Sequence, residues 1–101
     1  MTPAITRKQR EQIDTAAGLA DGLSARQTAE AFGVHPAAVM HHRRRLRHLR
    51  VTAADIAATI YAAEPGAVDA ALLALFRQRR QEQKQRTKAA RRNRKSKGDE
   101  P

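Results

Sequence analysis

The chain has 101 residues, with 20 Lys and Arg residues against 10 Asp and Glu residues, so its formal net charge is +10. That excess favours a polyanionic partner, nucleic acid first and an acidic membrane surface second. The absence of cysteine excludes a disulfide scaffold and a cysteine-ligated zinc site. Because the sequence has neither an apolar leader segment nor an 18-residue apolar run, we expect a cytoplasmic chain outside the membrane.

Apolar residues and charge are unevenly distributed along the chain. All 17 Leu, Ile, Val and Phe residues lie within residues 1–76, whose formal charge is +2. Residues 77–101 contain 11 Lys and Arg residues and 3 acids, and their net charge is +8. We therefore expect a nearly neutral folded part, followed by a basic part without a core of its own.

The first predicted helix covers about residues 7–20. Thr6 and Gln9 have the spacing of a capping box, in which a hydroxyl and an amide each satisfy a free backbone N–H at the start of a helix. Apolar residues then recur at helical spacing, and the pair Asp21–Gly22 ends the segment.

A second capping box, formed by Ser24 and Gln27, predicts a short helix that ends at Gly33. Glycine adopts the left-handed backbone conformation without a Cβ clash, which suits the end of a helix. Pro36 suits the first position of a third helix, which we expect to run to about Arg50. Four residues share one face of this third helix, namely Val39, His42, Leu46 and Leu49.

Two more helices are predicted beyond residue 51. The segment Thr52–Asp55 opens the first of them, and Glu64–Pro65–Gly66 breaks it. The last helix starts near Ala67 and has an apolar stripe formed by Val68, Leu72, Leu75 and Phe76. Good helix formers continue after this stripe without an apolar face, so the basic part either extends the helix or frays. We expect residues 96–98 and the acidic end to be disordered.

The pattern within residues 6–51 resembles a helix-turn-helix DNA-binding domain. The matching positions are Gly22–Leu23–Ser24, Thr28–Ala29, Phe32–Gly33–Val34, Val39 and Leu46. The pattern is most similar to the LuxR/GerE-type modules, and sigma-factor and resolvase-type segments are similar too. The resemblance implies that two helices cross closely at Ala29. The sequence departs from the pattern at His35, where a Ser or Thr cap is usual, and at Ala38, where a polar residue is usual.

The resemblance also implies that the third helix enters the major groove of duplex DNA. The outward positions that would reach base edges are His35, Ala37, Met40, His41 and Arg44. Arg44 is the best candidate for guanine recognition, because its guanidinium can donate to both major-groove acceptors. Contacts to backbone phosphates are expected from Arg43, Arg45, Arg47 and Arg50, and from Ser24 and Arg26 at the start of the second helix.

The charge pattern of residues 35–50 favours DNA contact over a merely solvated face. This segment contains five arginines, all four histidines and no acid, whereas a solvated helix normally mixes both signs. The histidines include no i,i+4 pair, so we expect no metal and no cofactor. We find no nucleophile with a base and no phosphate-cradling glycine loop, and therefore do not expect an enzyme.

We therefore expect an all-α helix-turn-helix bundle of about five helices with a basic C-terminal extension that is helical or disordered. Residues 1–50 would form the DNA-binding domain, residues 51–76 an additional helical pair, and residues 77–101 a basic tail. The helical pair either provides a dimer interface or completes the core of one chain. The candidate interface residues are Ile56, Ile60, Val68, Leu72, Leu75 and Phe76.

The expected function is binding of double-stranded DNA by a small, nucleoid-associated transcriptional repressor that acts as a homodimer on two half-sites. The sequence contains no recognisable effector domain, so occupancy would depend on the concentration of the protein itself, as in autoregulated plasmid or phage circuits. The alternative is a partition, packaging or recombination accessory protein that uses the same DNA-binding unit. A non-specific nucleic-acid chaperone is a third hypothesis.

Overall fold

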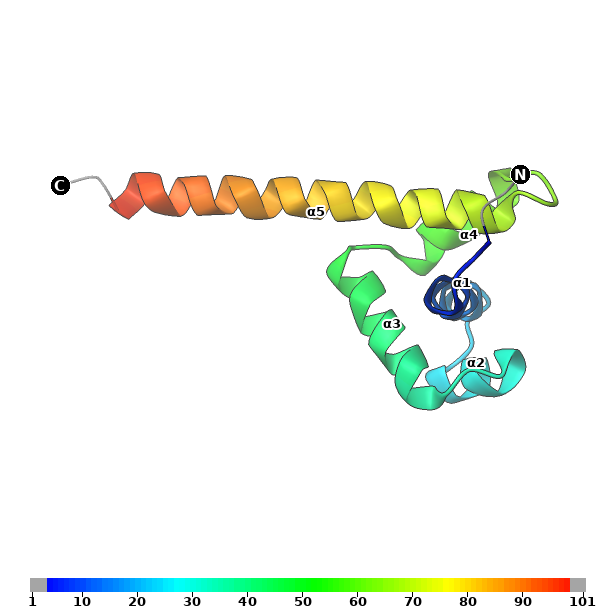
Figure 1. Ribbon diagram of the computed structural model, residues 1–101. Helices are drawn as coiled ribbons and strands as arrows, with labels where there is room; N and C mark the ends of the chain where they lie inside the picture. The colour runs from blue at the N-terminus through cyan, green and yellow to red at the C-terminus, as the bar shows by residue number, and fades with distance from the viewer. Residues whose placement is uncertain (1–3, 99–101) are drawn as a thin grey trace.

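The computed structural model describes the backbone of residues 4–98 and the side chains of residues 4–92. This part of the chain forms five helices and contains no strand, which confirms the all-α class. The helices are α1 (Arg7–Ala20), α2 (Ala25–Phe32), α3 (Pro36–His48), α4 (Ala53–Ala62) and α5 (Val68–Gly98). Figure 1 shows α1 to α4 gathered at one end of α5, which continues far beyond them.

The helix starts agree with the capping signals in the sequence. The boxes formed by Thr6 with Gln9, Ser24 with Gln27 and Thr52 with Asp55 all have both reciprocal hydrogen bonds. At the start of α3, the His35 side chain takes the place of the usual Ser or Thr cap. Its ring Nδ1 accepts a hydrogen bond from the Ala37 N–H at 3.1 Å.

Three of the turns use a left-handed backbone conformation, at Gly22, Gly33 and Arg50. Gly33 has a φ of 66° at the end of α2, as its position in the sequence predicts. Arg50, between α3 and α4, also has a positive φ of 59°, a conformation that is uncommon outside glycine. Its carbonyl accepts a hydrogen bond of 2.9 Å from the Arg79 guanidinium on α5. The turn after α3 is therefore attached to α5.

The core consists of two clusters of buried residues. The larger cluster joins α1, α3, α4 and α5, and its buried members are Ile13, Ala16, Leu46, Leu49, Val51, Ile56, Leu72 and Phe76. The smaller cluster joins α2 to α3 through Ala29, Val34 and Val39. Because α1 contacts each of the other four helices, the α2–α3 pair and the α4–α5 pair are both anchored to it.

α1 and α2 approach each other closely at Gly18, a position that the sequence pattern does not single out. A Cβ added at Gly18 would lie 2.6 Å from Thr28 Cγ2 and closer still to the hydroxyl of Thr28. Thr28 is buried, and its hydroxyl donates a hydrogen bond to the Ser24 carbonyl at 2.8 Å. Ala29 packs in the α2–α3 cluster, in keeping with the expectation that the two helices of this pair cross closely there.

The expected dimer interface is largely occupied within one chain. Ile56, Leu72 and Phe76 are at most 1 % exposed and pack against α1 and α3. Ile60, Val68 and Leu75 are partly buried against the same cluster. The apolar stripe of α4 and α5 therefore completes the core of the monomer, and its three buried members cannot form a seam with a second copy.

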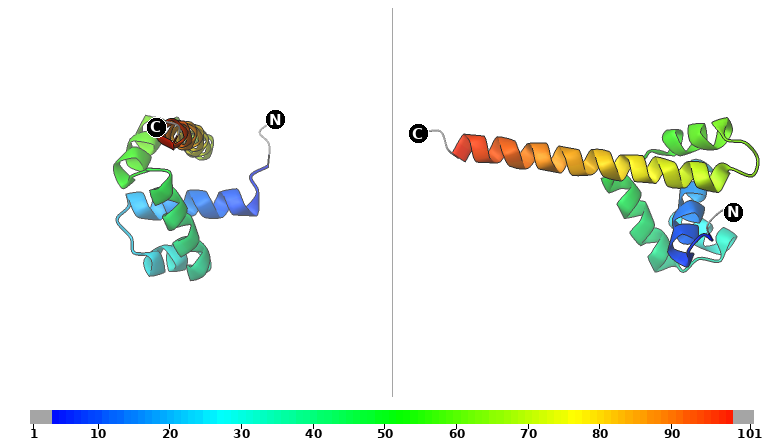
Figure 2. Two further views of the ribbon diagram at one scale, coloured as in Figure 1. Left: turned by 90° about the vertical axis from the view of Figure 1, so that its left-hand side faces the viewer. Right: turned by 45° about the horizontal axis from the view of Figure 1, so that its top comes forward.

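The basic segment extends α5 as a continuous helix to Gly98. The expectation of disorder is therefore wrong for residues 96–98, and the acidic end at residues 99–101 lies outside the described part. The right-hand view in Figure 2 shows α5 leaving the bundle as a single long helix. Among the helices of the described residues, none is both long enough and apolar enough to span a lipid bilayer.

Candidate nucleic-acid interface

The helix α3 has one buried face and one exposed basic face. Val39, His42 and Leu46 point into the molecule and are at most 5 % exposed. The residues expected to face outward, His35, Ala37, Met40, His41 and Arg44, are all exposed, together with Arg47 and His48. The helical period therefore separates the packing residues from those that are available to a partner. Met40 is the largest apolar side chain of the exposed face, at 51 % exposure.

The arginines of α3 lie on its exposed face and on its two flanks. Arg43 is half-buried and, with Arg47 and Arg50, lines a groove at the start of α4. Arg45 lies on the opposite flank, toward the start of α1. Within the described residues, none of the five arginines between positions 43 and 50 forms an ion pair. Their charge is therefore available to an external anion.

His42 has a structural role, as its place on the apolar face predicts. Its side chain is buried, and its Nε2 lies 3.7 Å from Glu11 Oε1 on α1. Burial lowers the pKa of His42, and the nearby Glu11 carboxylate only partly opposes that effect. The rings of His41 and His42 meet edge to face with centroids 5.2 Å apart, so the buried ring supports the exposed one.

The start of α2 has fewer free groups for binding a phosphate than the sequence predicts. The Ser24 hydroxyl already accepts a hydrogen bond from the Gln27 N–H at 3.1 Å. Arg26 is exposed, and its Nε lies 3.6 Å from Glu30 Oε1 in the next turn. A phosphate at this end of α2 would therefore compete with Glu30 for Arg26.

Three residues take part in the connection between α3 and α5 but were not among the predicted site residues, namely His48, Arg79 and Gln83. Arg79 donates to the Arg50 carbonyl and lies 3.4 Å from Asp55 Oδ2. Gln83 lies 3.4 Å from the exposed His48 ring. Arg79 and Gln83 continue the face of α5 that carries Leu72 and Phe76, at intervals of three and four residues. Following this face beyond the apolar stripe in the sequence would have identified both of them.

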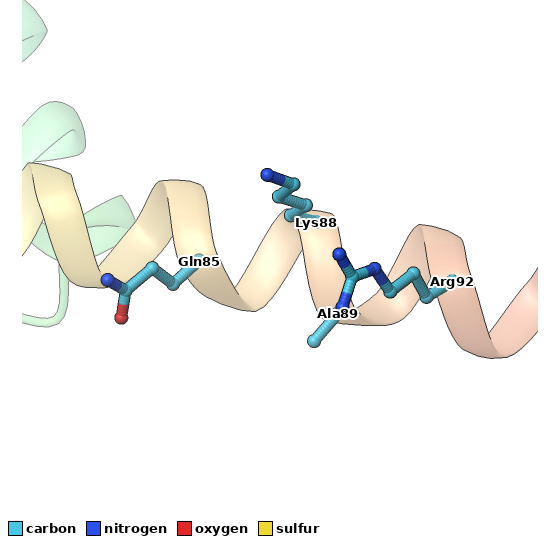
Figure 3. Close-up of a pocket in the computed structure, with 4 residues that line it drawn as sticks. All are labelled: Gln85, Lys88, Ala89 and Arg92. Carbon is cyan, nitrogen blue, oxygen red and sulfur yellow. The ribbon is translucent and has the colours of Figure 1, made fainter.

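Beyond Gln83, α5 continues away from the bundle. Figures 1 and 2 show this free part on the side of α3 that faces away from α1. Its cationic side chains in the described part are Lys84, Arg86, Lys88, Arg91 and Arg92. Figure 3 shows a shallow hollow on it, lined by Gln85, Lys88, Ala89 and Arg92, all from the one helix. A surface of this kind suits a flexible or extended anion better than a small enclosed ligand.

The part of the chain that the structure describes contains no candidate metal site. No group of three or more His, Asp or Glu side chains there is arranged to hold a metal ion. No protein-family model, curated protein or solved structure matches the chain.

Proposed function

We propose that this protein binds duplex DNA sequence-specifically through a helix-turn-helix unit formed by α2 and α3, and that it acts as a small nucleoid-associated transcriptional repressor. The observation that carries the proposal is the exposed face of α3, which is rich in arginine and histidine and has no acid between residues 35 and 50. Such uncompensated charge on a regular element is a typical electrostatic footprint of nucleic-acid binding.

The dimensions of α3 suit the major groove. Its 13 residues correspond to a rod of about 20 Å, and the groove is about 12 Å wide, enough to admit a helix. The left-handed turn at Gly33 and the α2–α3 cluster hold α3 rigidly against its neighbour. In this arrangement Arg44 reads a guanine, while Ala37 and Met40 contact a thymine methyl group. Arg43, Arg47 and Arg50 contact the phosphate backbone on one flank.

The free part of α5 supplies a second basic arm to the same duplex. It starts where α3 ends, because Arg79 and Gln83 connect the two helices there. From Gln83 to Gly98 the helix adds about 22 Å of reach. A duplex that seats α3 in its major groove therefore has a basic rod beside its backbone, and this rod adds affinity without reading sequence.

A homodimer is part of the proposal, because one such unit reads only a few base pairs and repressors gain specificity from two half-sites. Its interface lies outside the buried stripe of α4 and α5.

The test compares two arginines of α3 on a duplex enriched from a randomised pool and on random DNA. Arg44→Ala is expected to cost about 1–3 kcal/mol of binding free energy on the enriched duplex, and much less on random DNA, because a bidentate base contact is lost. Arg47→Ala, the matched control, is expected to weaken both complexes alike. Equal losses on both duplexes for Arg44→Ala, or failure of the pool to enrich, would contradict the proposal.

A second candidate is an accessory role in partition, packaging or recombination, which the length of α5 favours. A basic helix that projects beyond the bundle can contact DNA outside the half-site, which suits proteins that bind arrays of sites. Genome-wide mapping of bound sites separates the two. Occupancy of the protein's own promoter supports repression, and clustered arrays elsewhere support the accessory role.

A further inference from the structure

A second basic surface lies on the flank of α3 that faces α1 and α5. It is a groove of about 370 Å³ between the first turns of α1, the middle of α3 and the early turns of α5. Four cationic side chains from these three helices line it, namely Lys8, Arg45, Arg77 and Arg80. No carboxylate is among the lining residues. The groove therefore concentrates positive charge at a place where three separate elements meet.

None of these four cations forms an ion pair within the described part of the chain. The ion pairs there engage other cations: Asp14 and Asp69 pair with Arg10, Asp55 and Glu82 with Arg79, and Glu30 with Arg26. Glu11, one turn from Lys8, lies against His42. Like charges that converge without a partner repel one another, and a bound anion removes that repulsion.

The other lining groups also suit an anion. Gln9 uses its side-chain oxygen to cap Thr6, so its amide N–H groups are free to donate into the groove. The start of α1 adds the partial positive charge of a helix N-terminus. Two guanidiniums from α5 and one from α3 supply the forked donors that match the oxygens of a phosphate group.

We propose that this groove is a phosphate-binding site. Its volume falls in the lower part of the range for small-molecule sites, so it accommodates a phosphorylated small molecule as well as a single backbone phosphate of DNA. His41 belongs both to the groove and to the exposed face of α3, so a phosphate next to a bound major groove lies within its reach. This site is independent of sequence reading by α3, because the four cations converge in the groove whether or not α3 binds DNA.

The test titrates the full chain with pyrophosphate and no DNA. The imidazole C–H signals of His41 and His42 in the NMR spectrum report occupancy, because both rings line the groove. Arg77→Gln/Arg80→Gln is expected to weaken pyrophosphate binding by at least about tenfold. Lys8→Gln/Arg45→Gln, which changes the other two helices, is expected to do the same.

The matched control is Lys88→Gln/Arg92→Gln, which removes the same charge from the same helix away from the groove. It is expected to leave pyrophosphate binding within about twofold of the unaltered chain, because exposed charges beyond a Debye length are screened. Equal weakening by the control and groove variants, or histidine signals that do not move, would overturn the proposal.

A competing duplex identifies the source of the phosphate. Displacement of pyrophosphate by duplex DNA assigns the site to the DNA backbone. Simultaneous binding of both assigns it to a phosphorylated small molecule. Either outcome supports the site. A chain that fails to bind DNA but binds pyrophosphate in the groove would contradict the proposed function alone.

Discussion

At the scale of single residues, Gly18 sets the distance between α1 and α2. Its missing side chain leaves room for Thr28, whose hydroxyl is fixed by a hydrogen bond to the Ser24 carbonyl. Rotating Thr28 away would break that bond, so the neighbour has little freedom to yield. The placement of α2, and with it the start of α3, therefore depends on a glycine inside a helix, where glycine is otherwise unfavourable.

We predict that Gly18→Ala lowers the free energy of unfolding by about 1–3 kcal/mol, because overpacking exceeds the gain in helix propensity. Urea unfolding measures the change. Gly66→Ala is the control, since a Cβ there meets nothing within 4 Å and the backbone has no positive φ. It is expected to change stability by less than about 0.5 kcal/mol. A Gly18→Ala protein as stable as the unaltered chain would contradict this account of the contact.

His42 gives the stability of the protein a pH dependence. Burial lowers its pKa in the folded chain below the ordinary value, so the unfolded chain binds a proton more readily. Stability contributed by the neutral ring is present above the ordinary pKa of histidine, near 6.5, and is lost as the pH falls below it.

We predict that the free energy of unfolding declines between pH 7.5 and 5.5, with a slope of at most about 1.4 kcal/mol per pH unit from this one group. His42→Gln keeps a donor for Glu11 and removes the titrating group, so its decline is expected to be shallower. The exposed His48→Gln is the control and retains the decline. A decline that His42→Gln leaves unchanged would assign the effect to other groups.

The sequence indicates which residues of α3 face outward, but not which partners they have. The helical period is a local property, and the exposure of Arg44 and the burial of His42 follow from it. The contact of Gln83 with His48 and the hydrogen bond from Arg79 to Arg50 join positions 35 and 29 residues apart. Such contacts depend on how α5 crosses α3, which no local pattern encodes.

At the scale of elements, α5 combines two kinds of helix. Its first turns, from Val68 to Phe76, are held by burial against α1 and α4. Its remainder has no apolar stripe and is held to the bundle by polar contacts from Arg79 and Gln83. Composition alone cannot distinguish a helical from a frayed continuation there, because good helix formers and the repulsion between their charges act in opposite directions.

We predict that Leu72→Asp unfolds the monomer. Leu72 is 1 % exposed within the larger cluster, and burying an unpaired carboxylate in place of its side chain costs at least about 4 kcal/mol. Circular dichroism should show a loss of helix. Ala74→Asp, on the exposed side of the same helix, is the control and should remain folded. A Leu72→Asp protein that remains fully helical would restore the possibility of a dimer seam at this stripe.

At the scale of the whole molecule, the proposed function gives separate roles to the bundle and to the free part of α5. The bundle holds α3, which is proposed to read the DNA sequence, and the free part of α5 is proposed to place positive charge along the DNA backbone. The contacts of Arg79 and Gln83 fix where the free part of α5 begins relative to α3. Removing residues 87–101 leaves that connection in place and takes away six Lys and Arg residues. This truncation therefore separates affinity from specificity.

DNA binding through α3 and the free part of α5 is tested by the affinity of the full and truncated chains for duplex DNA across a series of salt concentrations. We predict a steep fall of log K with log salt for the full chain, since each neutralised phosphate contributes about 0.9 to the slope. If roughly four of the removed Lys and Arg residues contact phosphates, the slope flattens by about 3.6 when residues 87–101 are removed. The ratio of affinities for the enriched and random duplexes should stay nearly constant. Absence of duplex binding, or an affinity that does not depend on salt, would contradict the account. An unchanged slope after truncation would show that residues 87–101 do not contact the DNA.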